Sequence, residues 1–216
     1  MKNIYAFLFL GLLAFAPKRL FNNTPQNLPF TQDWTNTTLI TANDNWSGVS
    51  GIEGFLGQDI TTGTGTDPQT LLGVSVIAND LSVLANQSST TITNGDVAEF
   101  DGIVNPTIAL QGSGTADAPH VIFYLNTSSL QNITVAYNLR DIDGTTDNSI
   151  QPVALHYRVG NSGNFTNVPA GFVADATSGP SQATLVTPVS AQLPAACNNQ
   201  TEVQVRVITS NAVGND

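Results

Sequence analysis

The sequence predicts an all-β fold, either a two-sheet sandwich or a barrel of antiparallel strands, from three observations. Apolar and polar residues alternate in several segments, which is the period of a half-buried strand. Clusters of glycine, asparagine and aspartate separate these segments, and no convincing helical period follows residue 30. Only 10% of the residues are charged, while Thr, Asn, Ser and Gly are abundant, as in extracellular β proteins.

The clearest alternation lies in the second half of the chain. It predicts strands at 132–140, 152–159 and 202–208, and residues 121–125 are apolar on both sides, as in a strand buried on two faces. A short glycine-containing loop at 160–163 indicates a hairpin. Weaker signals predict further strands at 72–78, 90–93, 97–100, 107–110, 165–168 and 183–189.

The first thirty residues predict export. Lys2 precedes an apolar run from Ile4 to Ala16, and these 13 residues are too few to span a bilayer but suit a signal peptide. We therefore expect a signal peptide or a short retained anchor helix at 1–16, a polar linker at 17–30 and the β domain at 31–216. The protein is then secreted or on the cell surface, and it meets a membrane only through an uncleaved N-terminal segment.

The charge of the chain excludes one class of partner. Beyond Arg19 only three arginines remain, against sixteen acidic residues. Binding a phosphate backbone requires clustered cations, so we expect no direct nucleic-acid binding. The single cysteine, Cys197, cannot form an intramolecular disulfide, and we expect it to be a small half-buried residue near the Pro194 turn.

The three arginines of the domain share one strand parity. Arg140, Arg158 and Arg206 each lie on the polar side of an alternating strand. If the three strands are neighbours, these arginines form one face that binds an acidic or neutral glycan. The alternative is that each arginine pairs with a carboxylate on a solvated sheet. The same side of each strand also carries the residue two positions earlier, namely Asn138, His156 and Gln204.

A loop rich in aspartate is the best metal candidate. Asp141, Asp143 and Asp147 alternate with other residues around a glycine, and calcium favours such oxygen ligands. The alternative is a polar turn whose side chains cap their own backbone. A split calcium site that draws Asp33 or Glu53 from elsewhere is a third interpretation.

Catalytic motifs are few. His120 and His156 lack the serine and carboxylate pattern of a hydrolase, and no Gly-x-Ser-x-Gly or phosphate-binding loop occurs. Sixteen acidic residues allow many carboxylate pairs, so glycoside hydrolysis stays open. Trp34 and Trp46 offer faces for stacking on sugars, or else they pack under a loop and donate their N–H locally.

Several stretches resemble the N-terminal accessory region of large secreted bacterial proteins. They are Leu28-Pro-Phe-Thr-Gln-Asp-Trp34, Asn45-Trp-Ser-Gly-Val49, Gly65-Thr-Asp-Pro-Gln69, Tyr137-Asn-Leu-Arg-Asp-Ile-Asp143, Leu155-His-Tyr-Arg-Val-Gly160 and Asn164-Phe-Thr-Asn-Val168. That group includes extracellular endonuclease/exonuclease/phosphatase-type nucleases and proteins with lamin-tail-like or surface-sorting domains. The resemblance covers most of 28–216. It implies a two-sheet antiparallel β-sandwich of jelly-roll-like form, whose last strand lies beyond Asp216.

We therefore expect a non-catalytic accessory module of an exported bacterial multidomain protein, which binds carbohydrate or a cell-surface polymer. The first alternative is the N-terminal ancillary fragment of a secreted nuclease or phosphodiesterase whose catalytic domain lies downstream. The second is a purely structural surface or adhesion domain. Calcium is the only cofactor that the sequence suggests.

Overall fold

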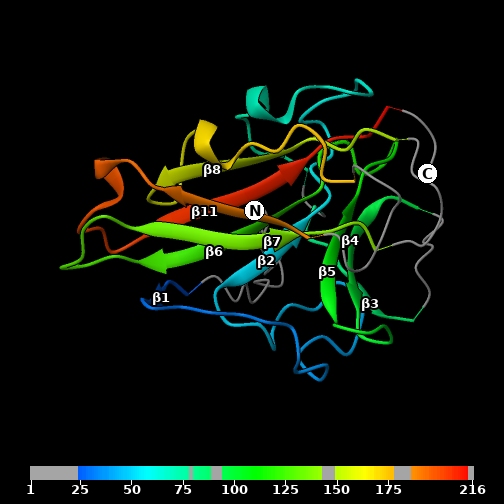
Figure 1. The fold of residues 1–216 in the computed structure, drawn as a ribbon, viewed down its shortest axis with the longest axis horizontal. Coiled ribbons are helices and arrows are strands. Elements are labelled where there is room, and N and C mark those ends of the chain that lie inside the picture. Colours follow the sequence, from blue (N-terminus) through cyan, green and yellow to red (C-terminus); the bar gives the residue numbers. More distant parts are fainter. Residues whose placement is uncertain (1–23, 78–79, 89–93, 143–148, 178–185, 214–216) are drawn as a thin grey trace, which may run out of the picture.

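The computed structural model describes residues 24–77, 80–88, 94–142, 149–177 and 186–213, and within them the chain is all-β, as predicted (Figure 1). The signal or anchor segment at 1–16 lies outside the described residues. In the part described, no helix is long and apolar enough to cross a membrane. The strands are β1 (Gln26–Asn27), β2 (Ile52–Phe55), β3 (Leu84–Gln87), β4 (Asp96–Phe100), β5 (Thr107–Gln111), β6 (His120–Asn126), β7 (Thr134–Leu139), β8 (Val153–Val159), β9 (Thr166–Asn167), β10 (Thr187–Gln192) and β11 (Val203–Thr209). Short 3₁₀ helices occupy η1 (Pro68–Thr70), η2 (Pro169–Gly171) and η3 (Ala195–Cys197).

The largest sheet has six strands and is centred on β11. Its order is β1-β6-β11-β8-β9, and β2 also pairs with β6. β11 is antiparallel to both β6 and β8, which confirms that the predicted strands at 121–125, 152–159 and 202–208 are strands and shows that they are neighbours. All seven residues of β11 are buried, because the strand is flanked on both edges and covered on both faces.

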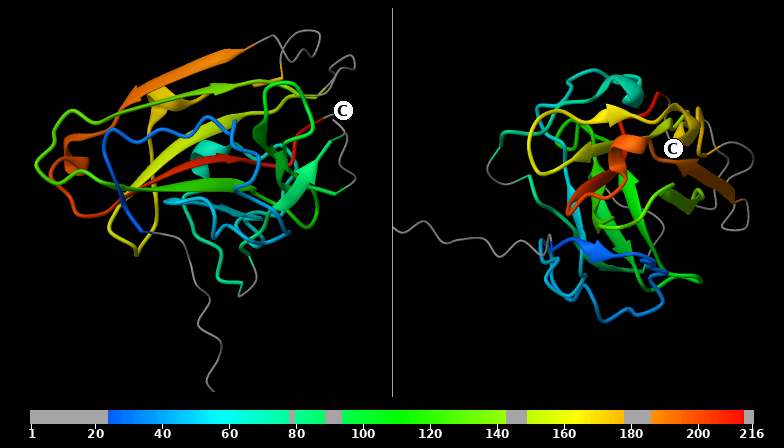
Figure 2. Two further views of the ribbon diagram at one scale, coloured as in Figure 1. Left: turned by 90° about the horizontal axis from the view of Figure 1, so that it is seen from below. Right: turned by 90° about the vertical axis from the view of Figure 1, so that its left-hand side faces the viewer.

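Two smaller sheets complete the fold. β7 pairs with β10, and β3, β4 and β5 form a three-stranded sheet. The β7–β10 pair lies in front of the large sheet in Figure 1 and forms a separate layer in the left view of Figure 2. Its inner side chains pack on one face of the large sheet, where the odd-numbered valines of β11 lie; the contributors are Val135, Tyr137, Leu139, Ala191, Val203, Val205 and Val207.

Strand direction differs from the expectation in two places. β1 pairs with β6 in parallel, and β3 pairs with β4 in parallel, so the sheets are mixed rather than purely antiparallel. β1 also belongs to the stretch that the sequence assigns to a polar linker. Its backbone groups complete the edge of β6, a role that hydropathy patterning does not reveal.

The weaker strand predictions have mixed outcomes. β4, β5, β9 and β10 lie within or close to their predicted ranges. Residues 72–77 form no strand, although their alternation favours one, and instead this irregular segment contacts the large sheet, where the Gly73 carbonyl accepts from Arg206. The segment at 90–93 lies outside the described residues. β2 was not predicted because Glu53 and Gly54 are weak strand formers, and here tertiary packing overrides propensity.

Trp46 is part of the core rather than a sugar-stacking residue. It is buried, and its indole N–H donates to the Ser82 carbonyl at 2.9 Å, as the local-packing interpretation expects. Trp34 is partly buried and packs against the same core. Gly54 of β2 makes room for Trp46, since a Cβ there would lie 2.5 Å from the indole Cζ2 and 2.8 Å from Val97 Cγ1.

Substituting Gly54 with alanine tests this close packing. We expect Gly54→Ala to lower the free energy of unfolding by about 1–3 kcal/mol, because the new methyl group overpacks the core. Urea unfolding followed by Trp fluorescence measures the change. Gly114→Ala is the matched control, since a Cβ at Gly114 meets nothing within 4 Å. Equal stabilities for the two variants would contradict the packing described here.

Candidate functional site

The second face of the large sheet is polar, and it is buried. The register of β2, β6, β11 and β8 places its side chains in rows across the strands. One row is Glu53, Ile122, Arg206 and His156; the next is Tyr124, Gln204 and Arg158; a third is Phe55, His120, Ile208 and Ala154. The segment that follows η1 covers these rows, so polar side chains on a central strand are shielded from solvent.

The structure brings together four of the six residues expected to form one polar face. His156 and Arg158 on β8 lie beside Gln204 and Arg206 on β11. The alternative of a solvated sheet does not hold for this group, because His156, Gln204 and Arg206 are buried.

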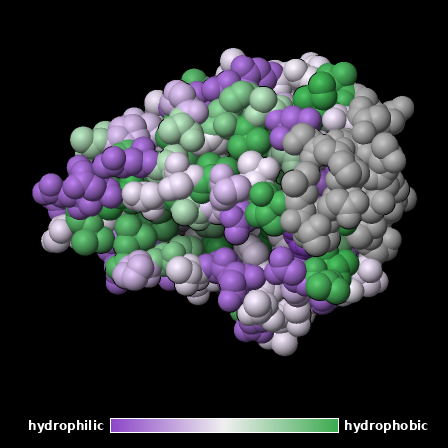
Figure 3. All heavy atoms as spheres, viewed as in Figure 1, coloured by the Kyte–Doolittle hydropathy of each residue, from purple (hydrophilic) through white to green (hydrophobic). Residues whose placement is uncertain are grey.

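Asn138 and Arg140 are not part of this group. They lie at the end of β7, which pairs with β10 in the other layer, so the condition that the three arginine strands are neighbours is not met by β7. Asn138 is exposed, and Arg140 Nη2 donates to the Asn105 carbonyl. The outer face of this small sheet is weakly polar, in the pale colours of Figure 3, and carries no charge along the two strands: Thr134, Ala136, Asn138, Pro188, Ser190 and Gln192.

Arg206 is the most buried cation in the described part of the chain, with a relative exposure of 0%. Its Nη1 donates to the Gly73 carbonyl at 2.7 Å, and its Nη2 donates to the Leu71 carbonyl. Nη2 also donates to Nδ1 of His156 at 2.8 Å. No carboxylate within the described ranges contacts Arg206, so backbone carbonyls and a neutral ring replace the carboxylate partner that the sequence interpretation offered.

An aromatic ring that two arginines share also stabilises the buried charge of Arg206. The guanidinium carbon of Arg206 lies 4.1 Å from the centroid of Phe165, and that of Arg158 lies 4.4 Å from it. Such cation–π contacts gain strength where water is excluded. Burial and the nearby charge of Arg158 lower the pKa of Arg206 to about 9. The side chain therefore stays protonated at neutral pH.

Both histidines of the domain are neutral. Burial, and then the charge of Arg206, lowers the pKa of His156 to about 3; the Pro68 carbonyl partly opposes this. Because Arg206 donates to its Nδ1, the ring proton of His156 lies on Nε2. Burial and the same arginine lower the pKa of His120 to about 3 as well.

Arg158 has a different set of partners. Its Nη1 donates to the Gly163 carbonyl at 2.8 Å, and its Nη2 donates to Oε1 of Gln204. The Gln204 amide donates in turn to Glu202 at 2.7 Å, so that carboxylate reaches the arginine only through an amide. Burial lowers the pKa of Arg158, and Tyr124 and Glu202 only partly oppose this. No carboxylate in the segments described bonds directly to Arg158.

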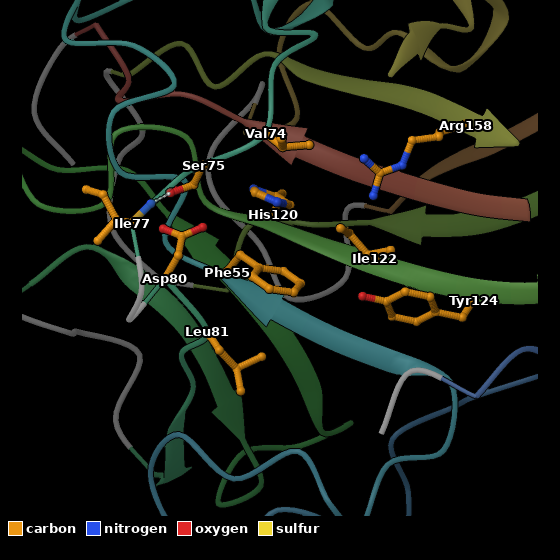
Figure 4. A pocket seen from close by; sticks show the side chains of 10 residues that line it. All are labelled: Phe55, Val74, Ser75, Ile77, Asp80, Leu81, His120, Ile122, Tyr124 and Arg158. Carbon is orange, nitrogen blue, oxygen red and sulfur yellow. Dashed lines mark hydrogen bonds between the residues drawn. The ribbon is translucent and has the colours of Figure 1, made fainter. Parts of the chain in front are cut away.

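A pocket of about 220 Å³ opens beside Arg158 (Figure 4). Its floor comes from β2 and β6, through Phe55, His120, Ile122 and Tyr124. Its opposite wall comes from the segment after η1 and the residues that follow it, through Val74, Ser75, Ile77, Asp80 and Leu81. Arg158 closes one end, and Asp80 with Ser75 lies at the other end in the close-up (Figure 4).

The pocket floor includes a buried tyrosine–glutamate pair. Tyr124 donates its hydroxyl proton to Oε2 of Glu53 at 2.9 Å. Burial, and then the Glu53 charge, raises the pKa of Tyr124. At the far end, burial raises the pKa of Asp80 to about 6. The backbone N–H of Gln58 donates to its carboxylate and partly lowers that pKa.

The sequence interpretation missed Phe55, Tyr124, Asp80 and Phe165 as site residues and did not place His120 in a site. A signal for two of them was present. His120 and Tyr124 share the strand parity of Arg206, and only the apolar character of 121–125 concealed this. Phe55 and Asp80 join the site through β2 and a loop, where the sequence carries no comparable pattern.

The calcium prediction remains open. Asp143 and Asp147 lie outside the described residues, and Asp141 is partly buried at their edge. Among the residues described, no group of three or more His, Cys, Asp or Glu side chains is placed to hold a metal ion. Glu53 instead accepts from Tyr124. Asp33 Oδ1 accepts from the backbone N–H and hydroxyl of Thr35, and these bonds lower the pKa of Asp33.

Replacing Arg206 tests its structural role. We expect Arg206→Met to lower the free energy of unfolding by about 3–5 kcal/mol, since it leaves the Leu71 and Gly73 carbonyls and His156 without their donor. Chemical denaturation measures the change. The matched control, Arg140→Met, removes a half-exposed arginine and should cost about 1 kcal/mol or less. A neutral effect of Arg206→Met would show that its buried bonds do not stabilise the fold.

His156 also predicts a dependence of stability on pH. Between pH 6.5 and about 3 the unfolded chain takes up a proton that the buried ring refuses, so stability is full above pH 6.5 and falls as the pH falls. The slope is about 1.4 kcal/mol per pH unit for one group. His120 adds to it, while Asp80 opposes it, because its folded pKa is raised from 3.8 to about 6.

His156→Gln isolates this contribution. Glutamine keeps an acceptor for Arg206 but has no titrating group, so the stability gap between the two proteins should change by about 1.4 kcal/mol per pH unit between pH 6 and 4.5. Urea unfolding at several pH values gives both profiles. Parallel profiles would mean that the His156 ring does take up a proton in the folded state.

Comparison with known proteins does not place the chain in a family. No protein-family model matches the sequence, and neither the curated proteins nor the solved structures give a match. The resemblance to accessory regions of secreted bacterial proteins therefore stays a prediction, and function is argued from the geometry of the site.

Proposed function

We propose that the domain is a non-catalytic binding module of an exported protein, and that the pocket beside Arg158 holds one residue of an acidic or neutral glycan. The ligand would be a carbohydrate or a cell-surface polymer, met outside the cell. The two-layer arrangement of the large sheet and β7–β10 supports a jelly-roll-like sandwich as the scaffold.

One observation carries this proposal. Arg158 lines a pocket while no carboxylate among the described residues bonds to it directly. A guanidinium has five N–H donors; Nη1 and Nη2 of Arg158 each use one of theirs on Gly163 and Gln204, and each keeps one for another partner, while Nε is buried. An arginine whose charge is not matched inside the protein is suited to a ligand that brings an acceptor.

The lining of the pocket supports a sugar residue in particular. Phe55 and Ile122 supply apolar surface, and Tyr124, Ser75 and Asp80 supply groups that bond to hydroxyls. The volume of about 220 Å³ lies below the roughly 300 Å³ of ordinary small-molecule sites, so it suits one residue of a chain.

Two of the pocket's titratable groups favour binding over acid–base catalysis. A histidine with a pKa of about 3 is a weak base near neutral pH, and a tyrosine with a raised pKa is a weak acid. His120 and Tyr124 therefore suit recognition better than proton transfer, whereas Asp80, whose pKa is raised to about 6, does titrate near neutral pH.

A glycan array and a pair of arginine variants test the proposal. We expect the wild-type domain to bind at least one glycan class. Arg158→Gln, which keeps part of the stem, should reduce that binding by about ten-fold or more, because a charge-assisted bond is lost. Arg140→Gln is the matched control and should bind normally, since Arg140 lies in the other layer. Equal binding by wild type and Arg158→Gln, with both folded, would contradict this site.

A further inference from the structure

The pocket has two chemically different ends, which bear on the class of sugar it accepts. Arg158 forms one end, and Asp80 with Ser75 forms the other, with His120 between them in the close-up (Figure 4). A ligand that fills the space therefore meets a cationic donor at one end and acceptors at the other. A sugar that carries only hydroxyl groups can bond to the acceptors at the Asp80 end, but it offers no negative charge to Arg158.

His120 provides the most specific feature of the floor. Its side chain is 3% exposed, and its ring stacks on Phe55 with centroids 5.3 Å apart and planes 18° apart. Its Nδ1 donates to the Ala118 carbonyl at 2.8 Å, which fixes the tautomer and leaves a lone pair on Nε2. His120 makes no other hydrogen bond in the part of the chain described, so Nε2 is an acceptor in the pocket lining that can bond to a ligand.

The cationic end is reinforced from behind. Arg206 shares the Phe165 ring with Arg158, so two positive charges lie near one another, and no carboxylate of the described residues bonds to either of them. The positive charge of the buried Arg206 guanidinium therefore also favours an anion bound at Arg158. A carboxylate suits this end because its two oxygens match the fork of the guanidinium donors.

We propose that the pocket selects a uronic acid, a sugar whose carboxylate bonds to Arg158 while one of its hydroxyls donates to Nε2 of His120. This inference rests on the proposed glycan-binding function and narrows it to acidic sugars. The Asp80 end accepts further hydroxyl protons, and it disfavours a second negative charge on the same residue. The pocket then selects a sugar by its charge and also fixes its orientation, with the carboxylate at the Arg158 end and hydroxyls at the Asp80 end.

Three small probes separate these contributions. D-Glucuronate carries the carboxylate, its methyl ester keeps the shape without the charge, and D-glucose has a hydroxymethyl group in place of the carboxylate. Titration of each probe followed by protein NMR shifts gives a dissociation constant. We expect glucuronate to bind about ten-fold or more tightly than the other two, as a charge-assisted arginine bond provides.

Protein variants assign the two contacts. Arg158→Gln should remove the preference for glucuronate over its methyl ester. His120→Asn keeps a donor for the Ala118 carbonyl but loses the acceptor, so it should weaken all three probes several-fold. His120→Gln places an amide near the former Nε2 and should restore much of that binding. Thermal unfolding of each variant confirms that it is folded.

The outcomes distinguish the two levels of the proposal. Equal binding of glucuronate, its ester and glucose overturns the selection of uronic acids while leaving a glycan site in place. Binding that is selective for glucuronate yet unchanged in Arg158→Gln overturns the assigned contact. If no probe binds and the glycan array is also silent, the glycan-binding function itself fails, and the uronic acid inference fails with it.

Discussion

The architecture depends on one buried cation, the guanidinium of Arg206 at the centre of β11. Removing an unpaired charge from water costs several kcal/mol, so the surrounding chain must compensate for it. The Leu71 and Gly73 carbonyls, the Phe165 ring and neutral His156 do so together. These partners come from separate segments, and satisfying the one cation ties the cover after η1 and the residue before β9 to the centre of the large sheet.

This arrangement couples the pocket to the core. Val74 and Ser75, which form one wall of the pocket, follow directly after the Gly73 carbonyl that Arg206 holds. The Phe165 N–H also donates to the Leu72 carbonyl at 2.8 Å, which anchors the same segment a second time. A wall fixed in this way needs little ordering when a ligand enters, and preorganisation of that kind favours affinity.

The sequence predicted the parts of the fold that repeat a simple period, and it failed where long-range packing decides. Strands β8 and β11 follow from their alternation, and β6 follows from its continuous apolar run. β2 cannot be predicted in this way. A glycine occupies position 54 because Trp46 packs against it in the fold, and the residue pattern of the strand does not show this contact. The arginine parity correctly placed Arg158 beside Arg206. The same parity could not reveal that β7 belongs to another sheet, nor that the segment after η1 would cover Arg206 and leave it buried.

Cys197 illustrates a further consequence of the packing. Its thiol is free and fully buried, and burial raises its pKa to about 11. It is also the only cysteine of the chain. A thiol reagent in solution therefore meets a reactive thiolate only when the region around η3 opens, and the rate of labelling reports how often that happens. The labelling rate of Cys197 thus measures native-state opening at one site near η3, separate from the pocket.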